Sequence, residues 1–182
     1  MKPLPLFFLL LVILLVTLAA EDLLPALIFL GQAHLVLFPI IFCFAVIVLP
    51  FMGALFFGMM TGLLEGLMVM HIQHGHVEIR IGWFIFFFML WALALQLLSD
   101  LTHGIRWELH ALASGLCTAT FILGEFLLLT FSRGNFFVTN DLLLLSCVPA
   151  GIAVLLAPLV YGLLEFLISP PRQASTNYLF PL

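Results

Sequence analysis

Long apolar runs separated by short polar connections fill almost the whole of this 182-residue chain. Hydrophobic residues make up 65% of the sequence and charged residues only 8%. A water-soluble fold cannot bury so much apolar surface, because soluble domains are roughly 45–50% apolar and 25% charged. A bilayer, in contrast, accepts apolar helices of about 20 residues. The sequence therefore predicts an all-α membrane protein, built as a polytopic bundle of transmembrane helices.

Prolines, glycines and charged clusters divide the chain into about six spans within a single integral membrane domain, residues 1–182. The second and third spans are separated by little more than Pro50 and should form a tight pair. Residues 21–34 are apolar but interrupted, and we expect them to lie on the membrane surface or to re-enter it. The predicted spans cover residues 4–20, 35–49, 51–70, 81–99, 109–131 and 142–168.

The basic residues bear on the orientation of the chain. With six crossings, Lys2, Arg106 and Arg172 fall on one side, and Arg80 and Arg133 fall on the other. Because basic residues favour the cytoplasmic side, this distribution predicts that both termini are cytoplasmic. The first span also resembles a secretory signal peptide, but we expect it to be retained, since its apolar stretch is long and the other helices need an entry point.

Composition and motifs argue against several classes of function. The formal net charge of -4 comes with no basic patch, so no nucleic acid is expected as a partner. The three cysteines lie inside apolar runs and are interpreted as buried small hydrophobes. No nucleophile elbow, phosphate loop or Ser-His-Asp order is present. The sequence thus predicts neither enzymatic activity nor a cofactor.

Small residues recur at intervals of four along the third span, as Ala54, Gly58, Gly62 and Gly66. In lipid, helices associate through close packing and polar contacts, and such a stripe allows two backbones to approach closely. Glu65 projects from the same broad face and should point at protein rather than lipid. We expect this face to dock a partner helix, and a leucine at Gly62 to block docking while leaving the fold intact.

Two further carboxylates lie near small residues. Glu165 follows Gly162 in the sequence YGLLEFL, a near copy of TGLLEGL in the third span, and Glu125 shares a helix face region with Gly115. Carboxylates inside a bilayer are costly unless they are paired, protonated or hydrated, so they are candidate functional residues. Hydrogen bonding between helices and a ligand or proton role both remain open. The near copy is also typical of inverted repeats in transporters.

A cluster of histidines, His71, His74 and His76, lies between the third and fourth spans. Imidazole is the commonest metal ligand, so a zinc or copper site is one interpretation. The spacing matches no established metal motif, and few acidic residues are nearby in the sequence. A solvated loop without bound metal is therefore the default interpretation.

The order of these features resembles the rod-shape-determining MreD family, small polytopic subunits of the bacterial cell-elongation machinery. The resemblance covers nearly the whole chain. In that family the acidic residue of the third helix is usually Asp, so Glu65 is a departure. The stretches that carry the resemblance are EDLLPALIFLGQAH, FPIIFCFAVIVLP, GALFFGMMTGLLEGL and VPAGIAVLLAPLVYGLLEFL.

The resemblance implies a non-enzymatic scaffold subunit in the bacterial inner membrane that supports cell shape and peptidoglycan synthesis. Its implied partners are MreC-like proteins, MreB-like filaments and the peptidoglycan synthases of the same membrane. The family's helical arrangement also resembles the substrate-binding subunits of energy-coupling-factor transporters. A small-molecule-binding transporter subunit, with a polar pocket near Glu65 and Glu125, is therefore the alternative.

Overall fold

The structure is a computed structural model. It describes residues 3–23, 36–68, 72–73, 76–77, 81–101, 106–133 and 140–168. Within these ranges the chain forms six helices and a small antiparallel ladder of two short strands. The elements are α1 (Pro3–Leu23), α2 (Phe38–Val48), α3 (Phe51–Met68), β1 (Ile72–Gln73), β2 (His76–Val77), α4 (Ile81–Leu101), α5 (Arg106–Arg133) and α6 (Asn140–Ile168).

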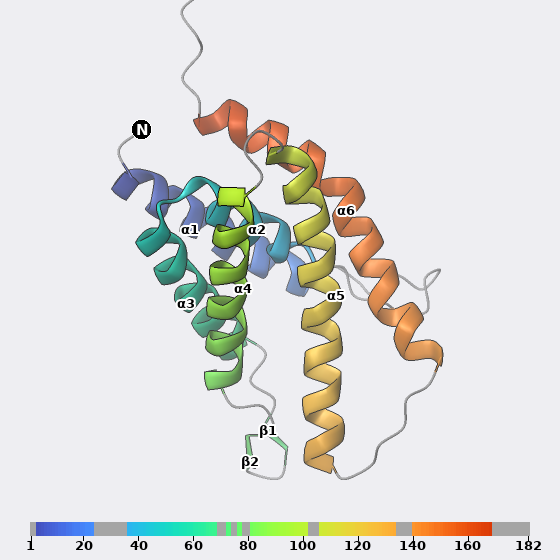
Figure 1. Cartoon of the computed structure of the whole chain (residues 1–182). Helices are drawn as coiled ribbons and strands as arrows, with labels where there is room; N and C mark the ends of the chain where they lie inside the picture. Colours follow the sequence, from blue (N-terminus) through green and yellow to red (C-terminus); the bar gives the residue numbers. More distant parts are fainter. Residues whose placement is uncertain are drawn as a thin grey trace, which may run out of the picture.

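Two helical hairpins surround the short helix α2 (Figure 1). α3 packs along α4, and α5 packs along α6, whereas α4 and α5 touch each other only slightly. α2 contacts α1 and both hairpins, so it holds them together. The prediction of an all-α helical bundle is confirmed.

Helix α2 is the most deeply buried element among those described. Every residue from Phe38 to Val46 is buried. Its 11 residues rise only about 16 Å, roughly half of a ~30 Å hydrocarbon core. Five of the described helices are long and apolar enough to cross a membrane, and α2 is not among them. The structure thus gives a short, protein-buried helix where the sequence predicts a span over residues 35–49, and the crossing itself stays a prediction.

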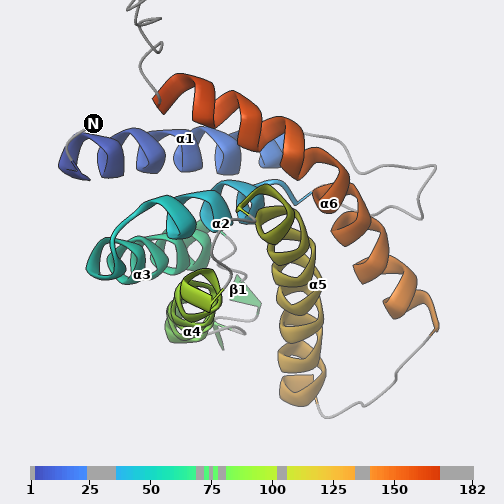
Figure 2. The same ribbon diagram turned by 45° about the horizontal axis from the view of Figure 1, so that its top comes forward.

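The other helices follow the predicted spans closely, with ends that differ by a few residues. α1 continues beyond its expected end at residue 20, through Glu21 to Leu23. Most of the predicted surface segment, residues 24–34, lies outside the described residues. The start of α1 and the end of α6 lie at the same end of the bundle, as both views show (Figures 1 and 2).

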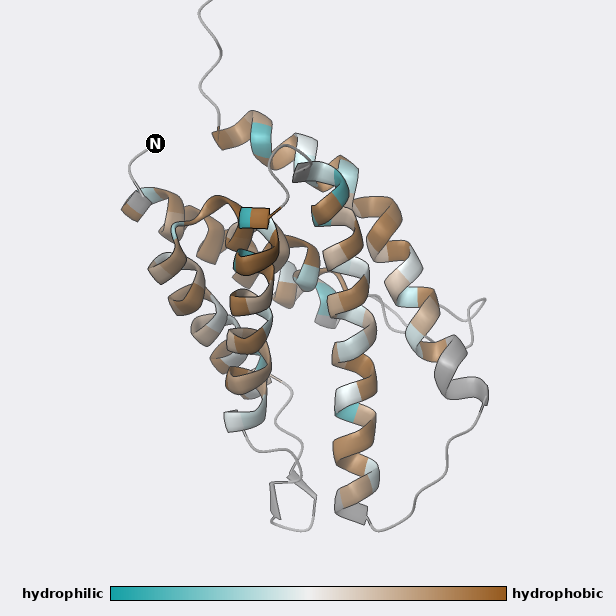
Figure 3. Ribbon diagram, viewed as in Figure 1, coloured by the Kyte–Doolittle hydropathy of each residue, from teal (hydrophilic) through white to brown (hydrophobic). Residues whose placement is uncertain are grey.

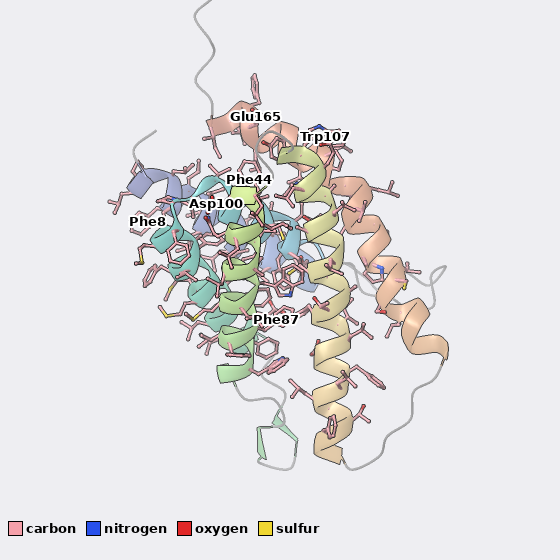
Figure 4. The ribbon with its side chains drawn as sticks, in the orientation of Figure 1. Phe8, Phe44, Phe87, Asp100, Trp107 and Glu165 are labelled. Atoms are coloured by element: carbon pink, nitrogen blue, oxygen red, sulfur yellow. The ribbon has the colours of Figure 1, made fainter. Side chains whose placement is uncertain are left out.

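Aromatic side chains fill the space where α2, α4 and α5 meet. Phe121 of α5 lies 5.4 Å from Phe38 and 5.6 Å from Phe88, measured between ring centroids. Phe42 lies 5.1 Å from Phe88, and Phe87 projects between α4 and α5 (Figure 4). These rings connect the two hairpins where their backbones have few contacts.

The outer surface of the helices is apolar almost throughout (Figure 3). Large hydrophobic side chains are exposed on each of the six helices, as expected for surfaces that meet lipid. The chain is therefore a multi-pass membrane protein. Cys43 and Cys117 are buried as expected, but Cys147 is exposed on α6 because that helix is covered on one side only.

Candidate functional site

The glycines of α3 bring its backbone against that of α4. A Cβ atom added at Gly58 would lie 2.9 Å from the Phe88 carbonyl oxygen. One added at Gly62 would lie 2.5 Å from the Phe84 carbonyl oxygen and 2.6 Å from the Ile85 backbone nitrogen. Only glycine fits such an approach without displacing the neighbouring backbone.

The predicted stripe therefore faces protein, since Ala54, Gly58, Gly62 and Gly66 are all buried. The helix that covers Gly58 and Gly62 is α4 of the same chain, which corrects the expectation that this face is left for a partner. A leucine at Gly62 would meet backbone atoms of α4. Against the earlier expectation, the structure therefore predicts that this substitution disturbs the fold.

A second close approach joins α5 to α6. A Cβ atom added at Gly115 would lie 2.3 Å from Cγ2 of Val154 and 3.1 Å from the Ala150 carbonyl oxygen. The neighbouring hydroxyl groups are satisfied within α5, because Ser114 donates to the His110 carbonyl and Thr118 to the Ser114 carbonyl. These hydroxyl groups add little bulk, so the α5–α6 interface also depends on small side chains.

Gly162 has a different environment from its sequence counterpart Gly62. No atom of the described residues lies within 4 Å of a Cβ added at Gly162 or at Gly151, and both glycines are exposed. The similar sequences TGLLEGL and YGLLEFL therefore occupy unlike positions, one inside the bundle and one on its outer surface. Gly115 packs against α6 of the same chain, whereas Gly162 lies on a face that the described chain leaves open.

The three carboxylates also differ from one another. Glu65 is only 6% exposed, which confirms that it points at protein, and Glu125 is half-buried. Glu165 is exposed near the end of α6, at the end of the bundle where Trp107 lies in the first turn of α5 (Figure 4). Glu65 lies in the last turn of α3, at the opposite end (Figure 1). The structure thus separates Glu165 from Glu65.

Two polar side chains that the sequence interpretation did not assign to a site cap the buried helix α2. The backbone N–H groups of Leu37 and Phe38 donate to Oε1 of Glu21, at the start of α2. At its other end, Nε2 of Gln96 donates to the carbonyl oxygens of Val46 and Leu49, the latter at 3.0 Å. These bonds satisfy groups that every helix leaves free at its ends. The Glu21 carboxylate also suits the positive end of the helix dipole.

A third polar side chain, His110 of α5, is completely buried beside α2. Its Nε2 lies 2.9 Å from the Ile40 carbonyl oxygen, and its ring contacts Phe44 and Tyr161 at 5.9 and 5.5 Å between centroids. Glu21, Gln96 and His110 thus connect α1, α4 and α5 to α2. The only signal in the sequence is that each is an isolated polar residue in or beside an apolar run.

The predicted histidine cluster is only partly covered by the structure. His76 lies in β2, whereas His71 and His74 lie outside the described residues. Among the residues that are described, no three His, Cys, Asp or Glu side chains come together as a metal site would require. The default interpretation of this cluster, a solvated loop without bound metal, therefore stays a prediction.

Comparison of the chain with profiles of known protein families, with curated proteins and with solved structures gives no match. The resemblance to the MreD family accordingly stays a prediction, as do the partners and the non-enzymatic role that it implies. The geometry itself offers two features with functional potential. These are the capped helix α2 inside the bundle and the uncovered outer face of α6.

Proposed function

We propose that this chain is a non-enzymatic scaffold subunit that docks partner transmembrane helices on the outer face of α6. The observation that carries this proposal is the open space above Gly151 and Gly162. Only 17% of the span Leu145–Ile168 is buried, against 39% of Phe51–Met68. The buried share of α6 is therefore the lowest among the long helices described.

The outer face of α6 has the composition of a helix-packing surface. Leu155, Leu159 and Phe166 are exposed by 76%, 71% and 79%, and they lie on the same side of the helix as the two open glycines. Glycines permit close backbone approach, and the large side chains between them supply van der Waals contact. A single partner helix laid along this face would contact both kinds of residue.

The wider role follows from the family resemblance. In this proposal the chain belongs to the bacterial inner membrane, with both termini cytoplasmic, in the cell-elongation machinery that makes lateral peptidoglycan. Its partners are MreC-like and MreB-like proteins and the peptidoglycan synthases. The position of both ends of the described chain at one end of the bundle is compatible with this orientation.

A small-molecule-binding transporter subunit is the second candidate, and the capped helix α2 favours it. Transporters often build substrate sites from short helices that end within the bilayer and expose their dipoles there. α2 is comparably short, although Glu21 and Gln96 cap its two ends, so the feature it shares with such sites is the presence of polar side chains inside the bundle. In this alternative, Glu65 and Glu125 contribute to the polar pocket.

The deciding experiment compares substitutions at glycines that all have open space around them. Leucine at Gly151 and Gly162 together should abolish co-purification of MreC-like and peptidoglycan-synthase partners from cells. Leucine at Gly82 of α4, which is equally open, is the matched control and should leave the complex intact. Unchanged co-purification in the double variant would refute docking on α6. Loss of solute uptake in Glu65→Gln, with partners retained, would favour the transporter.

A further inference from the structure

His110 differs from the other two polar side chains that contact α2. Glu21 and Gln96 satisfy groups at the ends of α2, which have no partner within the helix. Ile40, whose carbonyl His110 contacts, lies inside α2, where each carbonyl accepts a bond from the amide four residues later. The bond from His110 is therefore not needed to complete the backbone hydrogen bonds of α2.

The hydrogen bonding of the His110 ring is itself incomplete. Nε2 lies 2.9 Å from the Ile40 carbonyl oxygen, which can only accept, so this nitrogen carries the proton and donates it. Nδ1 then holds a lone pair, and no hydrogen-bond partner reaches it from the described residues. Because an unsatisfied buried acceptor lowers stability, the role of His110 is not explained by packing alone.

The surroundings of the ring suit a neutral imidazole. They consist of the Ile40 carbonyl and the Phe44 ring from α2, and the Ala157 backbone and the Tyr161 ring from α6. Among these described contacts Tyr161 is the one titratable side chain, and none is a carboxylate or a cation. A second proton on the ring would place a positive charge in the interior without a counter-charge, which is unfavourable.

The acidic residues closest to the ring along α5 and α6 do not supply a counter-charge. Glu108 lies two residues before His110, and residues at that spacing do not face each other on a helix. Glu165 is exposed on the outside of α6. The charged ring can therefore gain stabilisation only by leaving its place beside α2.

His110 lies close to one membrane interface. It is four residues from Arg106, the first residue of α5, which corresponds to about 6 Å along the helix. Trp107, in the first turn, is 52% exposed, and tryptophan at the end of a span is typical of the interface. A proton from the adjacent aqueous phase has only a short distance to travel to the ring.

We propose that His110 is a proton-binding site that controls the contact between α2 and α5. The neutral ring donates to α2 and keeps it docked. Uptake of one proton at Nδ1 charges the ring, which turns toward the aqueous phase and loosens α2 from α5. Because the loosened state binds one proton more, it is favoured as the pH falls. α2 contacts both hairpins, so the proton alters how they are held together, whether or not a partner docks on α6.

The test measures how fast two buried thiols react as the pH is lowered. Cys43 of α2 and Cys117 of α5 are completely buried and contact each other, so a dipyridyl disulfide reaches them only when α2 and α5 separate. The full chain is studied in detergent, with Cys147→Ser to remove the exposed thiol. Labelling is followed by intact mass from about pH 7.5 to about pH 5, the range in which histidine titrates.

His110→Gln is the counterpart that does not titrate, because its amide can still donate to the Ile40 carbonyl. At neutral pH the two chains should react at similar rates. In acid, the chain with His110 should react faster than His110→Gln at the same pH, by up to about tenfold per pH unit for uptake of one proton. Equal rates at every pH would overturn the proposal. Slower labelling of the His110 chain in acid would also overturn it, because the charged ring would then hold the helices more tightly.

Further arms keep the result decisive if His110→Gln does not fold. His110→Asn also lacks a titrating group and should remove the acid-dependent labelling, whereas His76→Gln, which changes a histidine of β2, should leave it in place. The opposite outcome for either variant would overturn the proposal. So would labelling of the His110 chain that does not accelerate in acid relative to a small thiol in the same micelles.

Discussion

The two helical hairpins of this chain use glycine in different ways. In the hairpin α3–α4, Gly58 and Gly62 face backbone atoms of the neighbouring helix. In the hairpin α5–α6, Gly115 faces mainly the end of the Val154 side chain. The first hairpin also contributes large rings to the core, among them Phe84 and Phe88, whereas the second leaves α6 mostly exposed.

This difference separates a structural glycine from one that is available for interaction. Where the opposing atoms are backbone, no change of rotamer can make room, so the glycine is required by the fold itself. Where they are the end of a side chain, a compensating substitution can restore the packing. Where no atom of another helix faces the glycine, as at Gly162, its small size is not needed for packing within the described chain.

The largest effect is expected from Gly62→Leu. Its side chain would collide with the backbone of Phe84 and Ile85 and should cost more than about 3 kcal/mol, beyond ordinary overpacking of a core. We expect loss of monodisperse protein in size-exclusion chromatography in detergent. Gly162→Leu is the control and should give the wild-type profile; a normal profile for Gly62→Leu would contradict the α3–α4 packing.

Gln96→Leu should have the next largest effect, because it leaves the carbonyls of Val46 and Leu49 without their partner inside the bundle. We expect a loss of about 2–3 kcal/mol in the free energy of unfolding. It is measured by titration with denaturing detergent in mixed micelles. Ser99→Ala removes only a bond to the Gln96 carbonyl within α4 and should change stability little. Equal effects of the two substitutions would show that Gln96 does not cap α2.

Gly115→Ala tests the second hairpin and should cost about 1–2 kcal/mol, because its Cβ overlaps Val154 Cγ2. Val154→Ala in the same chain should restore most of this loss in the same unfolding titration. The matched pair in the first hairpin is Gly62→Ala with Ile85→Ala. No recovery of stability is expected there, because the backbone of α4 is the obstacle and Ile85→Ala leaves it in place. Recovery in both pairs, or in neither, would remove the distinction between the hairpins.

The smallest effect is expected from Gly151→Ala, which places a methyl group into open space. The free energy of unfolding should rise by less than about 1 kcal/mol, because alanine favours a helix over glycine and meets no other atoms here. A melting curve in detergent is sufficient to measure it. A clear loss of stability would mean that α6 is covered by something even in the purified chain.

The helices themselves were largely predictable, because apolar runs of sufficient length allow few other structures. The role of α2 was not, since an apolar run has the same composition whether protein or lipid surrounds it. Hydropathy therefore treats residues 35–49 like any other span. The helix ends at Val48 because Pro50 disfavours helical geometry at Leu49, which is extended. Gln96, which is 47 positions beyond Leu49 in the chain, then satisfies the last carbonyls.

The candidate site was predictable only in part. The spacing of Gly58 and Gly62 correctly indicated a face that meets protein, since small residues at intervals of four serve close helix packing. It does not indicate which helix is met, and α4 takes the place that we assigned to a partner. Glu21 illustrates the same limit, because a carboxylate normally marks the end of a span. Here it continues α1 and caps α2 instead.

The capping of α2 has a consequence for how the chain is made. Glu21 is synthesised before α2, whereas Gln96 comes 47 residues after Leu49 at the end of α2. The capping partner at the start of α2 is therefore present long before the partner at its end. Until α4 has left the ribosome and entered the bilayer, the carbonyls of Val46 and Leu49 lack their partner. The N-terminal part of the chain therefore reaches its final arrangement only after the first hairpin has been inserted, and biogenesis cannot proceed strictly helix by helix.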